Sequence, residues 1–165
     1  MRISGLGDIN TVATAVQTQE GYYPGTLAYT NDNPGNLVFA GQAGATQGAG
    51  GFAAFPDYAT GYNALLNQIN LDASRGYTIL QFTTKYLGGD PNNPGVAPGG
   101  DPNVYAANIA AAAGVTPNDL LSTAIASGAV TPDSIINSVT AGASDPTTLA
   151  LMAVGGALLL AWALG

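Results

Sequence analysis

Helix-start signals recur along most of the chain and constrain its fold more than any other feature. Each signal is an Asp or Thr that precedes a stretch with apolar residues at helical spacing, so its side-chain oxygen can cap free amide groups. Glycine closes several of these stretches, because it readily adopts the left-handed conformation at helix ends. The pattern predicts a mainly α fold, with helices over residues 9–20, 58–72, 79–86 and 102–113 and after Thr116 and Thr131.

One short β element is expected between the first two long helices. Residues 37–40 and 52–55 are apolar runs, and residues 41–51 between them are rich in Gly, Ala and Gln. Two apolar runs joined by flexible residues predict a small β-hairpin with a long loop. Residues 87–100, rich in Pro, Gly and Asn, are expected to form another loop.

The composition leaves few side chains for chemistry. The chain has 3 Lys and Arg against 10 Asp and Glu, a formal net charge of −7, and neither His nor Cys. These counts exclude His and Cys catalysis, disulfides and the usual zinc sites, and we expect no metal or cofactor. The negative charge argues against nucleic acid as a partner and against electrostatic attachment to anionic lipid.

The last segment of the sequence is uncharged. Residues 149–164 are apolar or Gly throughout, which corresponds to about 24 Å of α-helix. With Thr147 and Thr148 the segment could just span a bilayer, and Trp162 suits a membrane interface. We therefore expect a transmembrane helix over residues 147–165, preceded by a helical spacer over residues 123–146. A buried core helix or an oligomer contact is the alternative.

The only Glu in the chain lies at the end of an apolar helix stripe. Ile9, Val12, Ala13, Val16 and Glu20 fall on one face of the first expected helix. Partial burial and the negative end of the helix dipole would both raise the pKa of this carboxyl. A carboxyl that keeps its proton near neutral pH can act as a general acid. The alternative without a function is a frayed helix end at which Glu20 is solvated.

A turn and a group of tyrosines follow this Glu. In residues 31–36, Pro34 and Gly35 fit the central positions of a type II turn, with Asn33 and Asn36 beside them. Amides and tyrosines are suited to sugars, because their polar groups bind hydroxyl and N-acetyl groups while the rings stack on pyranose faces.

Three stretches form a set: residues 16–23 (Val-Gln-Thr-Gln-Glu-Gly-Tyr-Tyr), residues 31–37 (Asn-Asp-Asn-Pro-Gly-Asn-Leu) and residues 51–66, which contain Phe-Pro-Asp-Tyr-Ala-Thr. Their order and spacing resemble the peptidoglycan-cleaving domains of the lysozyme-like superfamily. The set is most similar to phage-type virion muralytic domains and more distantly to bacterial glucosaminidases. The resemblance covers about residues 9–121 and implies a lysozyme-like α+β catalytic domain over residues 1–122.

The resemblance also implies roles for single residues. Glu20 matches the acid that ends the catalytic helix, and the Asn turn matches the loop that lines the cleft. Asp32 stands where the family has a second Asn, and either it or Asp57 could supply a second carboxylate. The predicted site contains catalytic Glu20, Asp32 and Asp57, and substrate-binding Tyr22, Asn33, Gly35, Asn36, Phe55, Tyr58 and Tyr62.

The implied function is cleavage of the β-1,4 bond of peptidoglycan, by hydrolysis or by transglycosylation. The expected location is a virion or the bacterial cell envelope, with peptidoglycan and virion or envelope proteins as partners. One alternative is a non-catalytic virion or envelope protein that binds glycan through a lysozyme-like domain. Another is a small membrane protein with an unrelated helical head.

Overall fold

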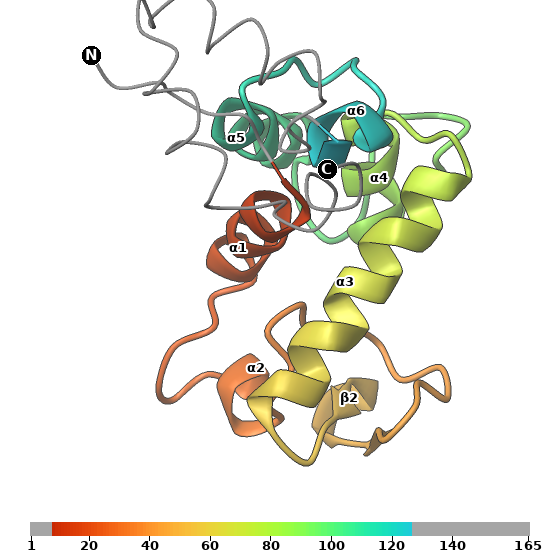
Figure 1. Cartoon of the computed structure of the whole chain (residues 1–165). Coiled ribbons are helices and arrows are strands. Elements are labelled where there is room, and N and C mark those ends of the chain that lie inside the picture. The colour runs from red at the N-terminus through yellow and green to blue at the C-terminus, as the bar shows by residue number, and fades with distance from the viewer. Residues whose placement is uncertain (1–7, 127–165) are drawn as a thin grey trace, which may run out of the picture. The chain divides into compact units, whose positions relative to one another are not determined.

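The computed structural model describes residues 8–126 of the 165-residue chain, and this part is mainly helical with one small antiparallel sheet (Figure 1). The predicted transmembrane helix over residues 147–165 lies outside the described residues, as does most of the predicted spacer. Within residues 8–126, no helix is long and apolar enough to cross a membrane. The elements are α1 (Ile9–Gln19), α2 (Leu27–Thr30), β1 (Thr46–Gln47), the 3-10 turn η1 (Ala49–Gly51), β2 (Ala53–Ala54), α3 (Tyr58–Ser74), α4 (Ile79–Tyr86), α5 (Pro102–Ala113) and α6 (Leu121–Ala126).

The capping residues predicted from the sequence begin three of the long helices. The Asp8 carboxylate accepts a hydrogen bond from the Thr11 amide at 2.7 Å and starts α1. Thr78 and Gln81 form a reciprocal capping box at α4, and Asp101 starts α5. Gly114, with a φ of 71°, ends α5 in the left-handed conformation. These helices are confirmed to within about one residue of their predicted bounds.

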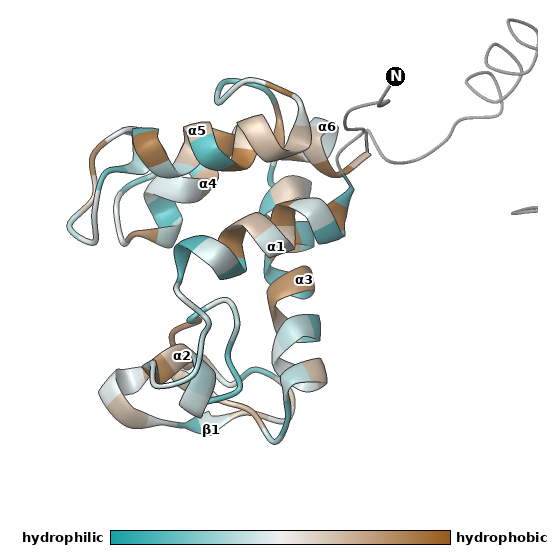
Figure 2. Ribbon diagram, turned by 90° about the vertical axis from the view of Figure 1, so that its left-hand side faces the viewer, coloured by the Kyte–Doolittle hydropathy of each residue, from teal (hydrophilic) through white to brown (hydrophobic). Residues whose placement is uncertain are grey.

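The main core lies where α1, α4, α5 and α6 meet the C-terminal half of α3. Figure 1 shows α3 running from the part that holds α2 and β2 to the part that holds α4, α5 and α6. Figure 2 shows apolar segments on α1, α3 and α5. Fully buried side chains from several helices fill this core, among them Val12, Val16, Leu65, Ile69, Ile79, Phe82, Ile109 and Leu121. Ala124, beyond the predicted domain boundary at residue 122, also belongs to this core.

The hairpin differs from its prediction in the position of one strand. β2 pairs with β1, which lies inside the stretch expected to be a loop. Residues 37–39 lie on the other side of residues 51–53, where the Phe39 amide donates to the Gly51 carbonyl and Val38 forms an isolated bridge with Phe52. Within residues 41–51 the backbone has positive φ at Gly41, Gly44, Gly50 and Gly51, and these turns place β1 beside β2.

The last described helix also starts later than predicted. Thr116 does not cap it; instead its amide and hydroxyl donate to the Asp119 carboxylate at 2.7 and 2.9 Å and close a turn. The carbonyls of Pro117 and Asp119 accept from the amides of Leu80 and Ile79 at the start of α4. The Leu121 amide, four residues after Pro117, donates to the Tyr77 carbonyl, so this segment pairs with the start of α4 and α6 begins only at Leu121.

Gly61 allows α3 to lie directly against the Asn turn. A Cβ atom at this position would overlap the carbonyl oxygen of Asp32 and contact the Pro34 ring. We expect Gly61→Ala to lower the free energy of unfolding by about 3 kcal/mol, because the backbones must move apart. Urea denaturation measures this change, and Asn63→Ala on the exposed face of α3 is the matched control, with an expected change within about 0.5 kcal/mol. If both variants lose the same free energy of unfolding, the close approach of α3 to the Asn turn at Gly61 is contradicted.

Candidate active site

Glu20 ends α1 in the position that the apolar stripe predicts. Val12, Ala13 and Val16 are fully buried, and Glu20 follows them as the C-cap with its amide bonded to the Val16 carbonyl. Gly21 then adopts a φ of 68° and takes the chain away from the helix. The side chain of Glu20 is partly buried, so its carboxylate lies at the boundary between core and solvent.

The Glu20 carboxylate is held by two donors that come from distant parts of the chain. The Tyr105 hydroxyl of α5 donates to Oε1 at 2.9 Å. The Asn36 side-chain amide, in the loop after α2, donates to Oε2 at 3.3 Å. The carboxyl group is therefore fixed in orientation by contacts on both of its oxygens.

The environment of Glu20 raises its pKa. Burial disfavours the ionised form and is the largest effect, while the hydrogen bonds from Tyr105 and Asn36 favour the ionised form and lower the pKa. The net direction is upward from the usual 4.5. A carboxyl with a raised pKa keeps a larger protonated fraction toward neutral pH, which general-acid chemistry requires.

A surface hollow of about 350 Å³ lies beside Glu20. Its volume is enough for about one sugar ring with ordered water. Asp101 also lines it, and hydrogen bonds from the Asn103 side chain and amide lower the pKa of that carboxyl. The lining residues are Gln19, Glu20, Leu87, Gly99, Gly100, Asp101, Val104 and Tyr105.

The three predicted residues of the Asn turn lie in different environments. Asn36, with a φ of 47°, contacts Glu20, and its Oδ1 is buried without a hydrogen-bond partner among the described residues. Asn33 is fully buried and bonds to the backbone of Leu37 and Ala53. The Gly35 carbonyl accepts from the Tyr86 hydroxyl. The structure therefore brings only Asn36 to Glu20, while Asn33 and Gly35 anchor the turn.

The two candidate second carboxylates do not line the hollow. Asp57 is exposed and caps α3, accepting from the amide and hydroxyl of Thr60 at 2.8 and 2.9 Å, and these bonds lower its pKa. Asp32 accepts from the Tyr22 hydroxyl at 3.4 Å. Phe55, predicted in the cleft wall, is 7% exposed and packs with Leu37 and Ala53. Tyr22, Tyr58 and Tyr62 lie in a row of rings and are not among the residues that line the hollow.

Two tyrosines beside Glu20 are not among the residues predicted from the sequence: Tyr105, which donates to Glu20, and Tyr86, whose ring contacts that of Tyr105. Burial raises the pKa of both Tyr86 and Tyr105 well above the usual value, so both hydroxyls stay protonated and act as donors. Their rings are in edge contact, with centroids 6.1 Å apart. Each tyrosine lies on an otherwise apolar face of a helix, where its hydroxyl needs a buried partner. This requirement indicates from the sequence that each hydroxyl has a partner, but it does not identify Glu20 or Gly35 as that partner.

Within residues 8–126, no group of three or more carboxylates is arranged to hold a metal ion. Comparisons of the chain with protein-family models, with curated proteins and with solved structures find no match. A function is therefore inferred from the fold and from the chemistry of Glu20 and its neighbours.

Removing the Tyr105 hydroxyl tests the arrangement at Glu20. Because this hydroxyl stabilises the ionised carboxylate, we expect Tyr105→Phe to raise the pKa of Glu20 further. An activity that needs protonated Glu20 falls as pH rises through that pKa, so the alkaline limb of the pH–rate profile should move to higher pH. If Tyr105→Phe lowers the rate but leaves the alkaline limb of the pH–rate profile at the same pH, Tyr105 does not set the pKa of Glu20.

Proposed function

We propose that the chain cleaves the β-1,4 glycosidic bond of peptidoglycan, with Glu20 as the general acid. The observation that carries the proposal is a partly buried carboxyl with a raised pKa, fixed on both oxygens and open to a hollow of about 350 Å³. The mainly helical fold with a small sheet, and the Glu at the end of its first helix, agree with the lysozyme-like resemblance. A virion or envelope location and a membrane anchor over residues 147–165 belong to the same proposal.

In this mechanism Glu20 first donates its proton to the glycosidic oxygen, and the bond to the anomeric carbon breaks. The resulting carboxylate is stabilised by the bonds from Tyr105 and Asn36. It then takes a proton from the attacking nucleophile, which is water in hydrolysis or the 6-hydroxyl of the same sugar in transglycosylation. Asp32 and Asp57 do not line the hollow, whereas Asp101 does, so the lining is compatible both with hydrolysis by two carboxyl groups and with transglycosylation by a single acid and base.

Mass spectrometry of digested sacculi tests the proposal. The full chain should release soluble muropeptides: 1,6-anhydro ends indicate transglycosylation, and new reducing ends identify the bond that is hydrolysed. Glu20→Gln is the matched variant and should release almost none. If the wild-type chain releases nothing from sacculi that a reference lysozyme digests, the proposed cleavage is wrong.

Glycan binding without turnover is the second candidate. It is favoured by the position of Asp57, whose carboxylate is engaged in capping α3 and not in the hollow. In that case the wild type and Glu20→Gln should both sediment with sacculi, and neither should release muropeptides. Both candidate functions therefore predict that the chain sediments with sacculi, and only cleavage predicts the release of muropeptides.

A further inference from the structure

Four tyrosines from three segments form a continuous row of rings, here named the tyrosine ladder: Tyr29, Tyr22, Tyr58 and Tyr62. Tyr29 lies on α2, Tyr22 follows α1, and the other two lie one turn apart on α3. Successive ring centroids are 5.2, 5.4 and 5.6 Å apart, and the last pair is stacked. Residues separated by up to 40 positions are thus assembled into one aromatic surface.

The ladder is held in place by its hydroxyl groups. Tyr58 donates to Gln17 Oε1 at 2.9 Å, and Tyr62 donates to Asn10 Oδ1 at 3.3 Å, so two rings are tied to the polar face of α1. Tyr22 donates to Asp32. Fixed rings lose little conformational freedom when a ligand binds, which favours affinity.

The ladder is accessible and separate from the hollow at Glu20. Tyr29 is 44% and Tyr58 is 41% exposed. No ladder residue is among those that line the hollow. The ladder packs on the face of α1 that carries Asn10 and Gln17, whereas Glu20 continues the buried face of Val12 and Val16. A ligand on the ladder therefore occupies a second surface.

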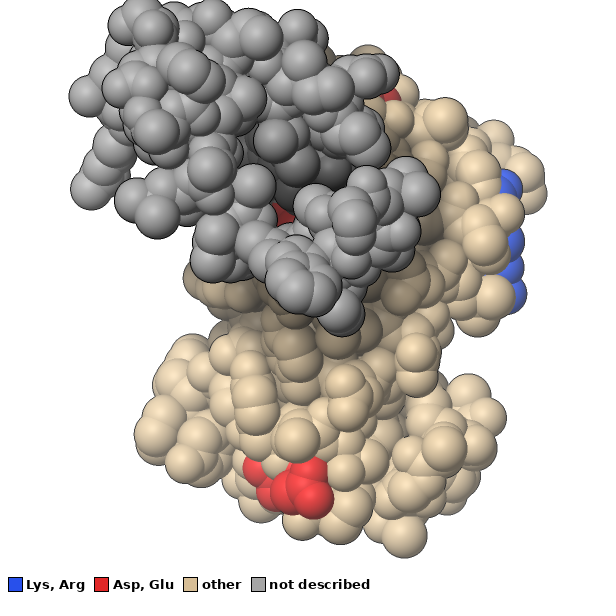
Figure 3. Space-filling model, viewed as in Figure 1, with Lys and Arg blue, Asp and Glu red and all other residues tan. Residues whose placement is uncertain are grey.

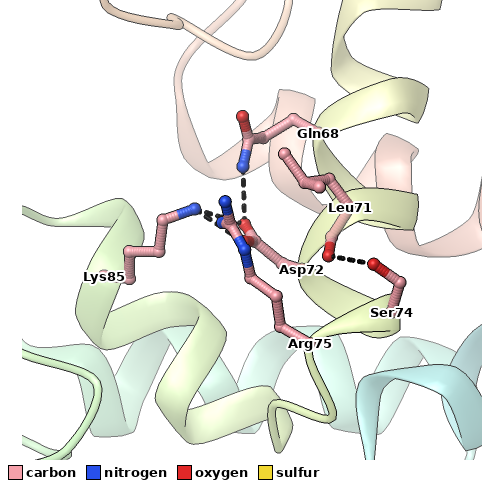
Figure 4. A network of polar contacts seen from close by, with 6 residues as sticks. All are labelled: Gln68, Leu71, Asp72, Ser74, Arg75 and Lys85. Carbon is pink, nitrogen blue, oxygen red and sulfur yellow. Dashed lines mark hydrogen bonds and ion pairs between the residues drawn. The ribbon is translucent and has the colours of Figure 1, made fainter.

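The charges of the described part indicate what such a ligand can be. Its two cationic side chains, Arg75 and Lys85, both contact the Asp72 carboxylate, at 2.7 and 2.6 Å (Figure 4). Figure 3 shows basic atoms only at one edge of the face in view. The ladder itself is bordered by the Asn10 and Gln17 amides and by the Asp32 carboxylate. Among residues 8–126 no cationic side chain borders the ladder for a polyanion, whereas a neutral pyranose ring offers C–H faces to the tyrosine rings and polar groups to the amides.

We propose that the tyrosine ladder is a secondary binding surface for the glycan strand of peptidoglycan, and that its rings stack on the neutral N-acetylglucosamine units of that strand. This inference rests on the proposed function for its substrate class. The surface holds the polymer while a neighbouring stretch enters the hollow at Glu20, so it increases attachment to insoluble material without taking part in bond cleavage.

Sedimentation of the full chain with insoluble chitin tests the ladder, because chitin is a neutral β-1,4-linked N-acetylglucosamine polymer. We expect Tyr58→Ala to weaken binding about three- to tenfold through the loss of stacking. Tyr29→Ala, at the end of the ladder, should weaken it in the same direction, and is the second variant if Tyr58→Ala does not fold. Tyr23→Ala is the matched control, because Tyr23 is 62% exposed and lies outside the ladder.

Two measurements separate the ladder from the reaction site. Hydrolysis or transglycosylation of short soluble peptidoglycan oligomers should stay within about twofold in the Tyr29→Ala variant, since one exposed ring is lost outside the hollow. Equal chitin binding by the ladder variants and Tyr23→Ala would overturn the inference, as would a parallel loss of turnover on short substrates. Ladder-dependent chitin binding by a wild type that cleaves nothing would support the ladder and refute the proposed cleavage. Cleavage by a wild type whose chitin binding does not depend on the ladder would support the proposed cleavage and refute the ladder as a binding surface.

Discussion

Exchange of Glu20 for glutamine is expected to lower the rate of glycan cleavage by about 10²–10⁴-fold, the usual contribution of a positioned general acid. Glutamine is nearly isosteric with glutamate and its Oε1 can still accept from the Tyr105 hydroxyl, but its amide is not acidic enough to protonate the glycosidic oxygen. Muropeptide release measured at several pH values gives the rate. Asp90→Asn, which removes an exposed carboxylate from the loop before α5, is the control and should leave the rate within about twofold.

The same Glu20→Gln exchange is expected to raise the melting temperature near neutral pH. The folded-state pKa of Glu20 lies above the unfolded value near 4.5, so the folded protein loses stability as pH rises from that value through the raised pKa. Glutamine does not ionise and escapes this loss. The difference in melting temperature should therefore be small at pH 4 and largest at pH 7. An equal difference in melting temperature at pH 4 and pH 7 would contradict a raised pKa of Glu20 in the folded protein. In the rate measurement, full activity of Glu20→Gln would contradict the general-acid role.

The parts of the fold that the sequence predicts well are those in which cause and effect lie close along the chain. Asp8, Thr78 and Asp101 each cap a helix through an amide two or three residues later, so spacing alone identifies them. Thr116 carries the same local signal and still does not start a helix. The carbonyls that follow it are bonded to α4, some forty residues away in sequence, and no local pattern reports that contact.

The candidate site shows the same division. The stripe on α1 predicts that Glu20 is partly buried, because burial of a helix face follows from its own period. The identity of its donor is not predictable, since Tyr105 lies 85 positions away on α5. The Asn turn gives residue types suited to sugars, but Asn33 uses its amide to bond Leu37 and Ala53. Whether an amide faces a ligand or the backbone depends on packing that composition does not specify.

Asp72 is a further case in which tertiary contacts decide the role of a residue. The sequence places it near the end of a helix, where an exposed carboxylate would be ordinary. In the structure its side chain is 1% exposed and bonds Gln68, Arg75 and Lys85 (Figure 4). Lys85 on α4 donates to both carboxylate oxygens, at 2.6 and 2.8 Å, and so joins α4 to α3. A buried carboxylate of this kind depends on its partners for compensation of the lost hydration.

Lys85→Met is therefore expected to lower the free energy of unfolding by about 3 kcal/mol, because it removes both bonds from α4 to Asp72 and leaves the buried carboxylate only Arg75, at the end of its own helix, as a cation. Arg75→Met is the matched control: its side chain is 42% exposed and its pair with Asp72 lies within one helical turn, so a loss of about 1 kcal/mol or less is expected. Urea denaturation of both variants at pH 7 measures the difference. If the two variants lose equal stability, the bonds from Lys85 on α4 to Asp72 on α3 stabilise the fold no more than the pair between Arg75 and Asp72 does. If Lys85→Met is as stable as the wild type, Asp72 is adequately compensated by Arg75 and Gln68 alone.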